Sequence, residues 1–225
     1  MKIVVTGAGG LLGWHASARI HAINCAAMHK GKPKPHELVA LNRNTFNDDE
    51  KLYAGLVGAD AVLHFAGINR GRNEDIEAGN PEIARRLSQY CMKASVRPHI
   101  VHSNSIQSVD DTPYGRSKRI ASEILSCIGG AYTDLMLPNL FGEGARPRYN
   151  NVTATFIEAL IKGAPAKINK NSKIPMLHVG AAAEIAINAV ADRLIGSKKI
   201  DARLISVADL FAKLQEIHRD YSANI

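Results

Sequence analysis

Short apolar runs alternate with amphipathic stretches along the first two thirds of this 225-residue chain. Runs of β-branched and apolar residues predict strands, and apolar residues spaced by three or four positions predict helices. The predicted strands cover residues 2–6, 37–41, 60–65, 99–102 and 133–137. Helices are predicted after the first strand, from Asn80-Pro81 and from Thr112-Pro113, the last with Thr or Asp as its cap and Pro at its first position. This order predicts a parallel sheet with helices on both faces, a Rossmann-type doubly wound α/β fold.

The buried faces of these helices follow from the same spacing. Three apolar stripes are expected to pack on the sheet: Leu12, Ala16, Ile20 and Ile23; Ile83, Leu87, Cys91 and Ala94; Ile120, Ile124 and Ile128. The pattern changes near residue 150, where helices are predicted at about 152–162, 181–195 and 206–222, the last capped by Ser206. We therefore expect a first domain at 1–145 and a small, mostly helical lobe at 146–225. The boundary is approximate because the chain of such lobes crosses back and forth.

Composition removes several classes of protein. The hydrophobic fraction of 46% and charged fraction of 22% are ordinary for a soluble protein, and no apolar run could span a bilayer. The formal charge of +7 comes from scattered residues, which argues against nucleic-acid binding and is compatible with an anionic small molecule. The three cysteines have no metal-site spacing and are expected to be reduced and mostly buried. We expect a cytoplasmic protein without a bound metal.

A glycine-rich turn follows the first strand. Residues 6–13 fit the pattern T-G-x-x-G-x-x-G at a strand-to-helix junction. In such a turn one glycine permits the tight bend, a second lets the backbone approach a pyrophosphate, and a third lets helix pack on strand. The helix N-terminus then offers N–H groups to the phosphates. The predicted cofactor-binding residues here are Thr6, Gly7, Gly9, Gly10, Leu11, Leu12 and Gly13.

The end of the second predicted strand bears on which dinucleotide is bound. A carboxylate there commonly holds the ribose 2′-hydroxyl of NAD, but this chain has Asn42 and Arg43 instead. An arginine can hold a 2′-phosphate through paired hydrogen bonds. The sequence therefore favours NADP(H), with NAD(H) as the alternative.

A candidate catalytic group lies in the middle of the chain. Tyr114 and Lys118 are four residues apart, so a helix places both side chains on one face. A nearby ammonium lowers the pKa of a phenol, which can then exchange a proton with a carbonyl or an alcohol. Ser105 follows a predicted strand and could orient the substrate oxygen, and Ser103 is a neighbouring candidate.

Together these features resemble the extended short-chain dehydrogenase/reductase family. The resemblance rests on Thr6–Gly13, His64-Phe65-Ala66-Gly67, Asn80, Ser105 and Tyr114–Lys118, in the family's order. It implies that further residues contact the nicotinamide cofactor: Ala66, Gly67, Asn80, Ser103, Pro138 and Leu140. It also implies a possible homodimer formed through the helices at 80–95 and 112–128.

A narrower resemblance is to the reductase domain of capsular polysaccharide biosynthesis enzymes of the CapF type. It rests on residues 66–70, 105–107, 137–142 and 146–156. Those enzymes use NADPH to reduce the 4-keto group of a UDP-linked 6-deoxy-amino sugar. The implied substrate-binding residues are Asn69, Arg70, Ser105, Gln107, Asn139, Arg148, Tyr149, Asn150 and Asn151. Those enzymes also carry a cupin domain that performs an epimerisation, and we expect that step to be absent from this chain.

Two other functions agree with the same residues. Epimerases and dehydratases of the family retain bound NAD and return the hydride to the substrate. The residues after Ser105, Ile106-Gln107-Ser108, lack the carboxylate and Thr that dehydratases usually have there. A non-catalytic protein that senses NADP is the third hypothesis, and an intact Ser/Tyr/Lys group argues against it because a sensor needs no proton donor.

Overall fold

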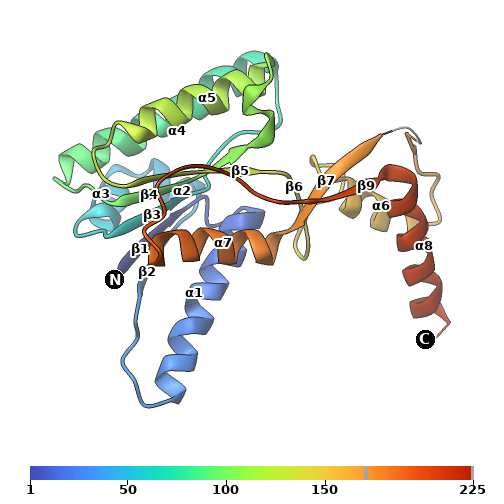
Figure 1. Ribbon diagram of the computed structural model, residues 1–225, viewed down its shortest axis with the longest axis horizontal. Helices are drawn as coiled ribbons and strands as arrows, with labels where there is room; N and C mark the ends of the chain where they lie inside the picture. The colour runs from blue at the N-terminus through green and yellow to red at the C-terminus, as the bar shows by residue number, and fades with distance from the viewer. Residues whose placement is uncertain (170–171, 224–225) are drawn as a thin grey trace. The chain divides into compact units, whose positions relative to one another are not determined.

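The computed structural model describes residues 1–169 and 172–223, which form two compact units (Figure 1). The first unit comprises Met1–Leu137 and Gly180–Ile200, and the second comprises Pro138–Val179 and Asp201–Ile225. The expected division at residue 145 differs from this one. The chain returns to the first unit because a strand at Gly196–Lys199 pairs with that unit's sheet.

A six-stranded parallel sheet forms the centre of the first unit. Its strands are β1 (Lys2–Thr6), β2 (Glu37–Leu41), β3 (Ala61–His64), β4 (His99–Ser105), β5 (Tyr132–Leu137) and β8 (Gly196–Lys199). The order is β2-β1-β3-β4-β5-β8, with every neighbouring pair parallel. The direction of winding reverses between β1 and β3, and in such sheets ligands bind beyond the carboxyl ends of the strands at that point. The predicted Rossmann-type fold is confirmed.

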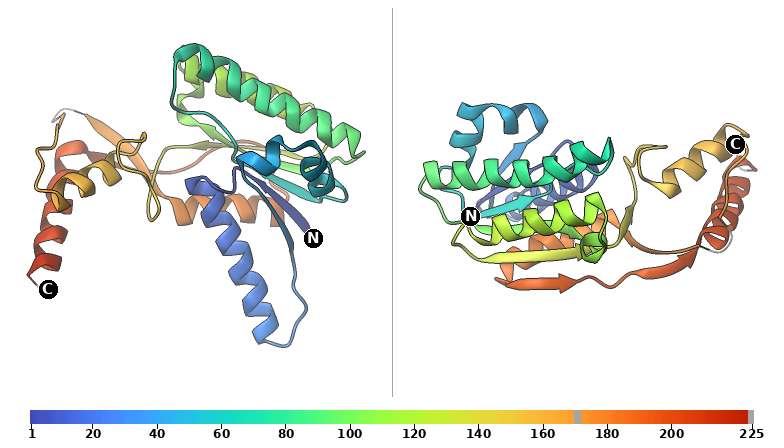
Figure 2. Two further views of the ribbon diagram at one scale, coloured as in Figure 1. Left: turned by 180° about the vertical axis from the view of Figure 1, so that it is seen from behind. Right: turned by 90° about the horizontal axis from the view of Figure 1, so that it is seen from above.

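Helices cover both faces of this sheet (Figures 1 and 2). On one face lie α4 and α5, and on the other lie α1 and α7. The helices of the unit are α1 (Leu11–His29), α2 (Arg43–Asn47), α3 (Asp49–Leu56), α4 (Asn73–Lys93), the 3₁₀ turn η1 (Ile106–Val109), α5 (Pro113–Ser126) and α7 (Val179–Ala191). Within the described residues no helix is long and apolar enough to span a bilayer.

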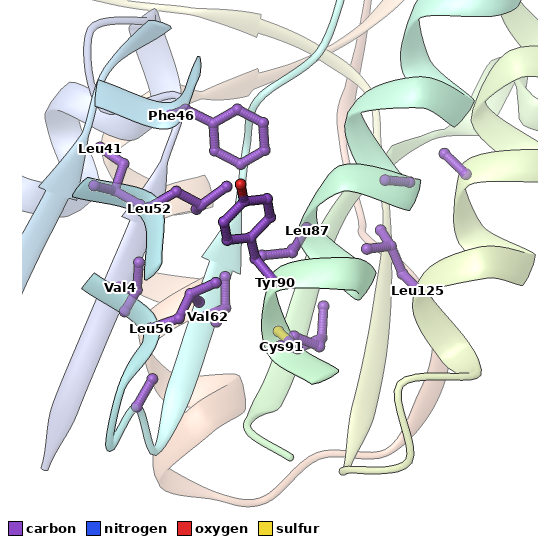
Figure 3. Close-up of a cluster of buried hydrophobic side chains, with 14 residues drawn as sticks. Val4, Leu41, Phe46, Leu52, Leu56, Val62, Leu87, Tyr90, Cys91 and Leu125 are labelled. Atoms are coloured by element: carbon purple, nitrogen blue, oxygen red, sulfur yellow. The ribbon is translucent and has the colours of Figure 1, made fainter. Parts of the chain in front are cut away.

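The core beneath α2, α3, α4 and α5 is apolar and closely packed. Figure 3 shows Phe46, Leu52, Leu87 and Tyr90 converging from three different helices on the same face of the sheet. Burial of such side chains contributes about 1.5–3 kcal/mol each. This packing fixes α4 and α5 against β4, and α5 carries the candidate Tyr and Lys.

Two helix predictions were wrong in detail. Helix α4 begins at Asn73, seven residues before the predicted Asn80-Pro81 start, and Pro81 lies inside it. Two acidic residues in its first turn stabilise the earlier start through the helix dipole. On α5 the buried residues are Gly115, Ser117, Lys118, Ala121 and Leu125, whereas Ile120 is exposed. The face that carries Lys118 is therefore also the face that packs on the sheet.

The cysteine prediction was half right. All three thiols are free, as expected, but only Cys91 is buried, while Cys25 and Cys127 are exposed. Cys25 lies on α1 outside its buried stripe, and Cys127 is the C-cap residue that follows α5. The first helix behaves as predicted at Leu12, Ala16 and Ile20, which are buried, and Ile23 is half-buried.

The second unit contains a three-stranded sheet and two helices. Its elements are β6 (Asn139–Phe141), α6 (Val152–Ile161), β7 (Lys173–His178), β9 (Arg203–Ser206) and α8 (Val207–Ser222). Strands β6 and β7 are parallel, and β7 and β9 are antiparallel. A small core of Phe156, Met176, Val207 and Leu210 joins the sheet to both helices. The Ser206 cap is confirmed by a 2.9 Å hydrogen bond from the Asp209 backbone N–H, but Ile217 of the predicted apolar face is exposed.

Candidate active site

The glycine turn between β1 and α1 has no room for side chains at two of its positions. Gly7 has φ +70°, and a Cβ there would lie 2.6 Å from the backbone nitrogen of Ala66. A Cβ on Gly13 would overlap the carbonyl oxygen of Gly7. These two glycines therefore let β1, α1 and the end of β3 approach one another closely.

The start of α1 is suited to binding an anion. Gly10 is the N-cap residue, and no side chain of the described residues caps this end. Its first turn contains no acidic residue, and Gly9 and Gly10 are exposed. A Cβ on Gly9 would approach only Asn42, at 3.7 Å. The N–H groups of the turn, with the partial positive charge of the helix end, fit the phosphates of a dinucleotide.

Thr6 ties this turn to the neighbouring strand. It is completely buried, its Oγ1 lies 2.9 Å from Nδ1 of His64, and it accepts a 3.3 Å hydrogen bond from the Ala66 backbone. Leu12 is buried against the sheet and Leu11 is half-buried. Thr6 and Leu12 thus fix the shape of the turn, while the exposed glycines present its surface.

The loop after β3 is held by Asn80 of α4. The Asn80 side chain accepts from the Ile68 backbone N–H at 2.8 Å and donates to its carbonyl at 2.9 Å. It also donates to Ser117 Oγ at 2.9 Å, and Ser117 donates to the carbonyl of Tyr114. The structure therefore places Asn80 between the Gly67 loop and α5, where it positions both. Its direct contact with a cofactor stays a prediction.

Asn42 and Arg43 lie where β2 ends. Asn42 caps α2, with its side chain accepting a 3.0 Å hydrogen bond from the Thr45 backbone. Arg43 is the first residue of α2 and is exposed. Asn42 therefore fixes the start of the short helix from which the Arg43 guanidinium is exposed.

The start of α5 places Tyr114. Thr112 caps the helix by accepting a 3.0 Å hydrogen bond from the Gly115 backbone, and Pro113 occupies the first turn, as predicted. A Cβ on Gly115 would overlap the carbonyl oxygens of Gln107 and Asp110. Glycine at this position therefore lets η1 contact α5 directly and brings the end of β4 beside Tyr114.

Ser105 and Tyr114 meet through their side chains. The pKa of Tyr114 was expected to be lowered by Lys118, but burial instead raises it, and a hydrogen bond with Ser105 partly opposes that rise. Ser105 Oγ also accepts a 3.1 Å hydrogen bond from the Gln107 backbone. The neighbouring Ser103 instead donates to the carbonyl of His64 at 3.3 Å. Of the two serines, Ser105 is the one the structure places at the phenol.

Lys118 is buried, with only 5% of its surface exposed. Its Nζ donates to the carbonyl of Ser103 at 2.5 Å and lies 3.3 Å from Nε2 of His102. Burial lowers the pKa of Lys118 to about 8, although Asp134 acts to raise it. The ammonium therefore lies close to its titration point near neutral pH.

The sequence interpretation missed three buried polar residues behind Lys118. Asp134 on β5 accepts from Asn104 at 2.8 Å and lies 3.1 Å from Nδ1 of His102. His102, Asn104 and Asp134 are 1%, 5% and 6% exposed. A signal for them existed, because polar residues inside apolar strands of a covered parallel sheet are rarely buried without a partner.

Three predicted substrate residues of the first unit are exposed and lie in segments that follow strands. Asn69 and Arg70 follow β3 in the loop before α4, and Gln107 lies in η1. All three side chains are exposed, and both Asn69 and Arg70 have interactions within the chain. Gln107 lies two residues from Ser105 and so belongs to the same edge of the sheet.

The second unit holds the other predicted substrate residues. Asn139 on β6 donates to the Pro175 carbonyl at 3.2 Å, and Asn151 caps α6 and donates to the Leu140 carbonyl at 2.9 Å. Tyr149 and Asn150 are exposed, Asn150 has φ +55°, Pro138 is buried and Leu140 is half-buried. Asn151 thus serves the local fold, and its contact with a substrate stays a prediction.

Arg148 borders a pocket in the second unit. Its Nε lies 2.8 Å from Oε2 of Glu158, and its backbone N–H donates to Thr155 at 2.9 Å. The pocket has a volume of about 370 Å³ and is lined by Arg148, Thr155, Phe156, Ala159, Ala164, Pro165, Ala166 and Lys167. An apolar wall with two basic residues at its border is suited to a flat ring that carries phosphate.

No group of three or more His, Cys, Asp or Glu side chains within residues 1–169 and 172–223 could hold a metal ion. The predicted catalytic side chains supply a phenol, a hydroxyl and an ammonium on α5 and at the end of β4. Such groups could exchange a proton with a substrate, and a bound nicotinamide would supply a hydride.

Comparison with known proteins agrees with this geometry. The model of the NAD dependent epimerase/dehydratase family matches residues 3–198. A UDP-2-acetamido-2,6-beta-L-arabino-hexul-4-ose reductase from Pseudomonas aeruginosa is 28% identical over 225 residues, covering 96% of this chain and 57% of the relative. The chain thus spans less than two thirds of that relative's length.

Solved structures show the same fold. The capsular polysaccharide assembling protein CapF from Staphylococcus aureus has a TM-score of 0.73 at 23% identity, covering 97% of this chain and 58% of that one. A Thermus thermophilus UDP-glucose 4-epimerase, solved in complex with NAD, has a TM-score of 0.76 at 17% identity, covering 97% and 83%. The resemblance to extended short-chain dehydrogenases/reductases of the CapF type is confirmed.

Proposed function

We propose that this chain, which belongs to the NAD dependent epimerase/dehydratase family, reduces a keto group on a nucleotide-linked deoxy sugar. The family match confirms the prediction of an NAD(P)-dependent oxidoreductase of the short-chain dehydrogenase/reductase type. The reductive direction and the deoxy-sugar substrate are our proposal. They rest on the reductase name of the Pseudomonas aeruginosa relative and on the state of Tyr114.

The placement of Tyr114 beside Ser105 carries the proposal, because Gly115 lets the turn after Ser105 pack directly on the start of α5. Burial raises the pKa of Tyr114, so the phenol is protonated near neutral pH and can act as an acid. Ser105 would hold the substrate oxygen next to it. Lys118 would stabilise the phenolate that remains and hold the nicotinamide ribose. Bound NADPH would supply the hydride.

We propose NADP(H) as the preferred cofactor because Arg43 is exposed at the first position of α2, with Asn42 rather than a carboxylate before it. Arg43→Ala should raise the KM for NADPH while leaving the KM for NADH unchanged. Lys34→Ala removes a charge from the exposed loop before β2 and is the matched control. Equal effects of both variants would mean that Arg43 acts only through net charge.

We propose a UDP-linked substrate, with the pocket of the second unit as the site for its nucleotide. Support comes from the basic residues Arg148 and Lys167 at an otherwise largely apolar pocket. The relatives add support, since the Pseudomonas aeruginosa protein is named for a UDP-linked sugar and the Thermus thermophilus protein for UDP-glucose.

The test is turnover of purified protein with NADPH and a panel of UDP- and dTDP-linked 4-keto-6-deoxy sugars, alongside native mass spectrometry. NADPH oxidation that depends on a keto sugar is the expected result. Stoichiometric NAD that co-purifies, with turnover in the absence of added NADPH, would establish the epimerase/dehydratase alternative instead. Binding of NADPH without turnover of any panel member would favour a sensor.

A further inference from the structure

A chain of buried polar side chains extends from Lys118 into the sheet. Lys118 Nζ lies 3.3 Å from His102 Nε2, and His102 Nδ1 lies 3.1 Å from Asp134 Oδ1. Each residue comes from a different element, α5, β4 and β5 respectively. Burying such groups is costly unless they are paired, so their arrangement is a constraint on the fold.

Two of the three side-chain neighbours of His102, Asp134 and Lys118, fix its tautomer, while the third, the Tyr132 hydroxyl, lies 3.2 Å from Nδ1. A carboxylate only accepts hydrogen bonds, so Nδ1 of His102 must carry the proton that points to Asp134. An ammonium only donates, so Nε2 must present a lone pair to Lys118. His102 is therefore neutral, which agrees with burial and Lys118 lowering its pKa to about 4.

The second carboxylate oxygen of Asp134, Oδ2, is linked to Ser105 through Asn104. This oxygen accepts from Asn104 Nδ2 at 2.8 Å. The Asn104 carbonyl oxygen accepts from the Ser105 backbone N–H at 2.8 Å. Ser105 in turn meets Tyr114 through its hydroxyl. One carboxylate thus reaches Lys118 through a histidine and Ser105 through an amide.

Resting on the proposed function, we infer that Asp134 is a positioning residue that aligns Lys118 through His102 and Ser105 through Asn104. Asp134 holds each intermediate side chain in one orientation. The imidazole then presents an acceptor to the ammonium, and the amide presents an acceptor to the Ser105 backbone. The same carboxylate favours the charged form of Lys118 across the imidazole.

The titratable groups around this cluster come from four elements. His64 on β3 lies with its ring 5.8 Å from that of His102, and burial holds its pKa well below the usual value. Tyr132 on β5 donates to Asp134 at 3.0 Å and shares a 2.8 Å hydrogen bond with Ser122. Burial raises the pKa of Asp134, but hydrogen bonds from its neighbours outweigh this and leave it lowered. Asp134 is thus the negative charge that faces Lys118.

The variant Asp134→Asn tests the inference sharply. A carboxylate has two accepting oxygens, whereas an amide has only one. In the variant, either the N–H of His102 or the NH₂ of Asn104 would therefore point at the donating NH₂ of the new amide. Loss of a residue that orients a catalytic group lowers activity roughly 10–100-fold by analogy with outer-shell partners of metal ligands. Because the carboxylate raises the pKa of Lys118, the alkaline limb of the kcat profile should also move to lower pH.

His102→Gln and His99→Gln form a matched pair. His99 is a buried histidine on the same strand, but its Nε2 meets Thr133 Oγ1 at 2.7 Å instead of Lys118. Both variants should lower thermal stability, and only His102→Gln should move the pH limb. An unchanged limb in Asp134→Asn, or equal shifts in both histidine variants, would overturn the inference.

A readout that does not need activity separates this inference from the proposed function. In ¹⁵N-histidine-labelled wild-type protein, the His102 signals, assigned by their loss in His102→Gln, should report a neutral ring protonated at Nδ1. A charged ring or a proton on Nε2 would overturn the inference even in an active enzyme. If no keto sugar is reduced, the proposed function fails and these signals still decide the inference.

Discussion

The two units hold their polar residues in opposite ways. In the first unit Lys118, His102 and Asp134 are buried and bonded to one another across three elements. In the second unit Arg148 and Tyr149 are exposed on the segment that leads into α6. A buried network must be satisfied for the chain to fold, so its geometry exists before a ligand arrives. Exposed loop residues can change at little cost to stability, so substrate preference can vary while the chemistry stays.

The largest expected effect on activity comes from the first unit, in the variant Tyr114→Phe. The phenylalanine keeps the packing of α5 and removes the proton donor, so kcat should fall roughly 10²–10⁴-fold with NADPH affinity unchanged. Steady-state kinetics and cofactor titration measure the two quantities. Tyr53→Phe, at an exposed tyrosine of α3, is the control. A Tyr114→Phe enzyme as active as the Tyr53→Phe enzyme would remove the phenol from the mechanism.

The pH dependence of reduction tests the buried side of the comparison. Burial lowers the pKa of Lys118 to about 8, so the ammonium is present below that pH and is lost above it. If reduction needs the charged form, kcat should fall about tenfold per pH unit above the pKa, since protonation changes tenfold per unit. Circular dichroism across the same range checks that the fold persists. A kcat that is flat to pH 10 would show that the charge is not needed.

Much of the first unit could be predicted because its signals are local. The glycine turn, the cap at Thr112 and the spacing of Tyr114 and Lys118 each need only neighbouring residues. The contacts within the network at Asp134 could not be predicted, because they join residues 30 and 32 positions apart along the chain through the pairing of β4 with β5. Strand register decides which polar residues meet, and a sequence without the sheet order does not show it.

The second unit was harder to predict for a related reason. Strands β6, β7 and β9 are short, and β7 contains Pro175, which a strand pattern usually excludes. Their pairing joins residues 139–141 to 176–178, and 173–176 to 203–206. Helices α6 and α8 were visible because their apolar spacing is local. The strands of the second unit were therefore not predicted, because long-range pairing stabilises them despite their weak strand propensity.

The glycine turn sharpens the distinction between folding and binding. Gly13→Ala would place a methyl group on the Gly7 carbonyl, and overpacking of this kind costs about 1–3 kcal/mol of unfolding free energy. Gly9→Ala meets only Asn42 at an ordinary 3.7 Å, so its stability should match the wild type while its NADPH affinity falls. Urea unfolding and cofactor titration of both variants separate these effects. Equal losses of stability would mean that Gly9 is also a packing residue.

The smallest expected effect comes from the second unit, where Arg148 and Lys162 both pair with Glu158, at 2.8 and 2.7 Å. Of these two basic residues, Arg148 lines the pocket and Lys162 does not. Arg148→Ala should weaken UDP binding about tenfold, because a charged hydrogen bond to phosphate contributes about 1.5–3 kcal/mol. Lys162→Ala should leave it unchanged, as isothermal titration with UDP would show. Since no catalytic atom is involved, kcat should stay constant in both variants. A fall in kcat with unchanged UDP affinity would contradict the assignment of nucleotide binding to this pocket.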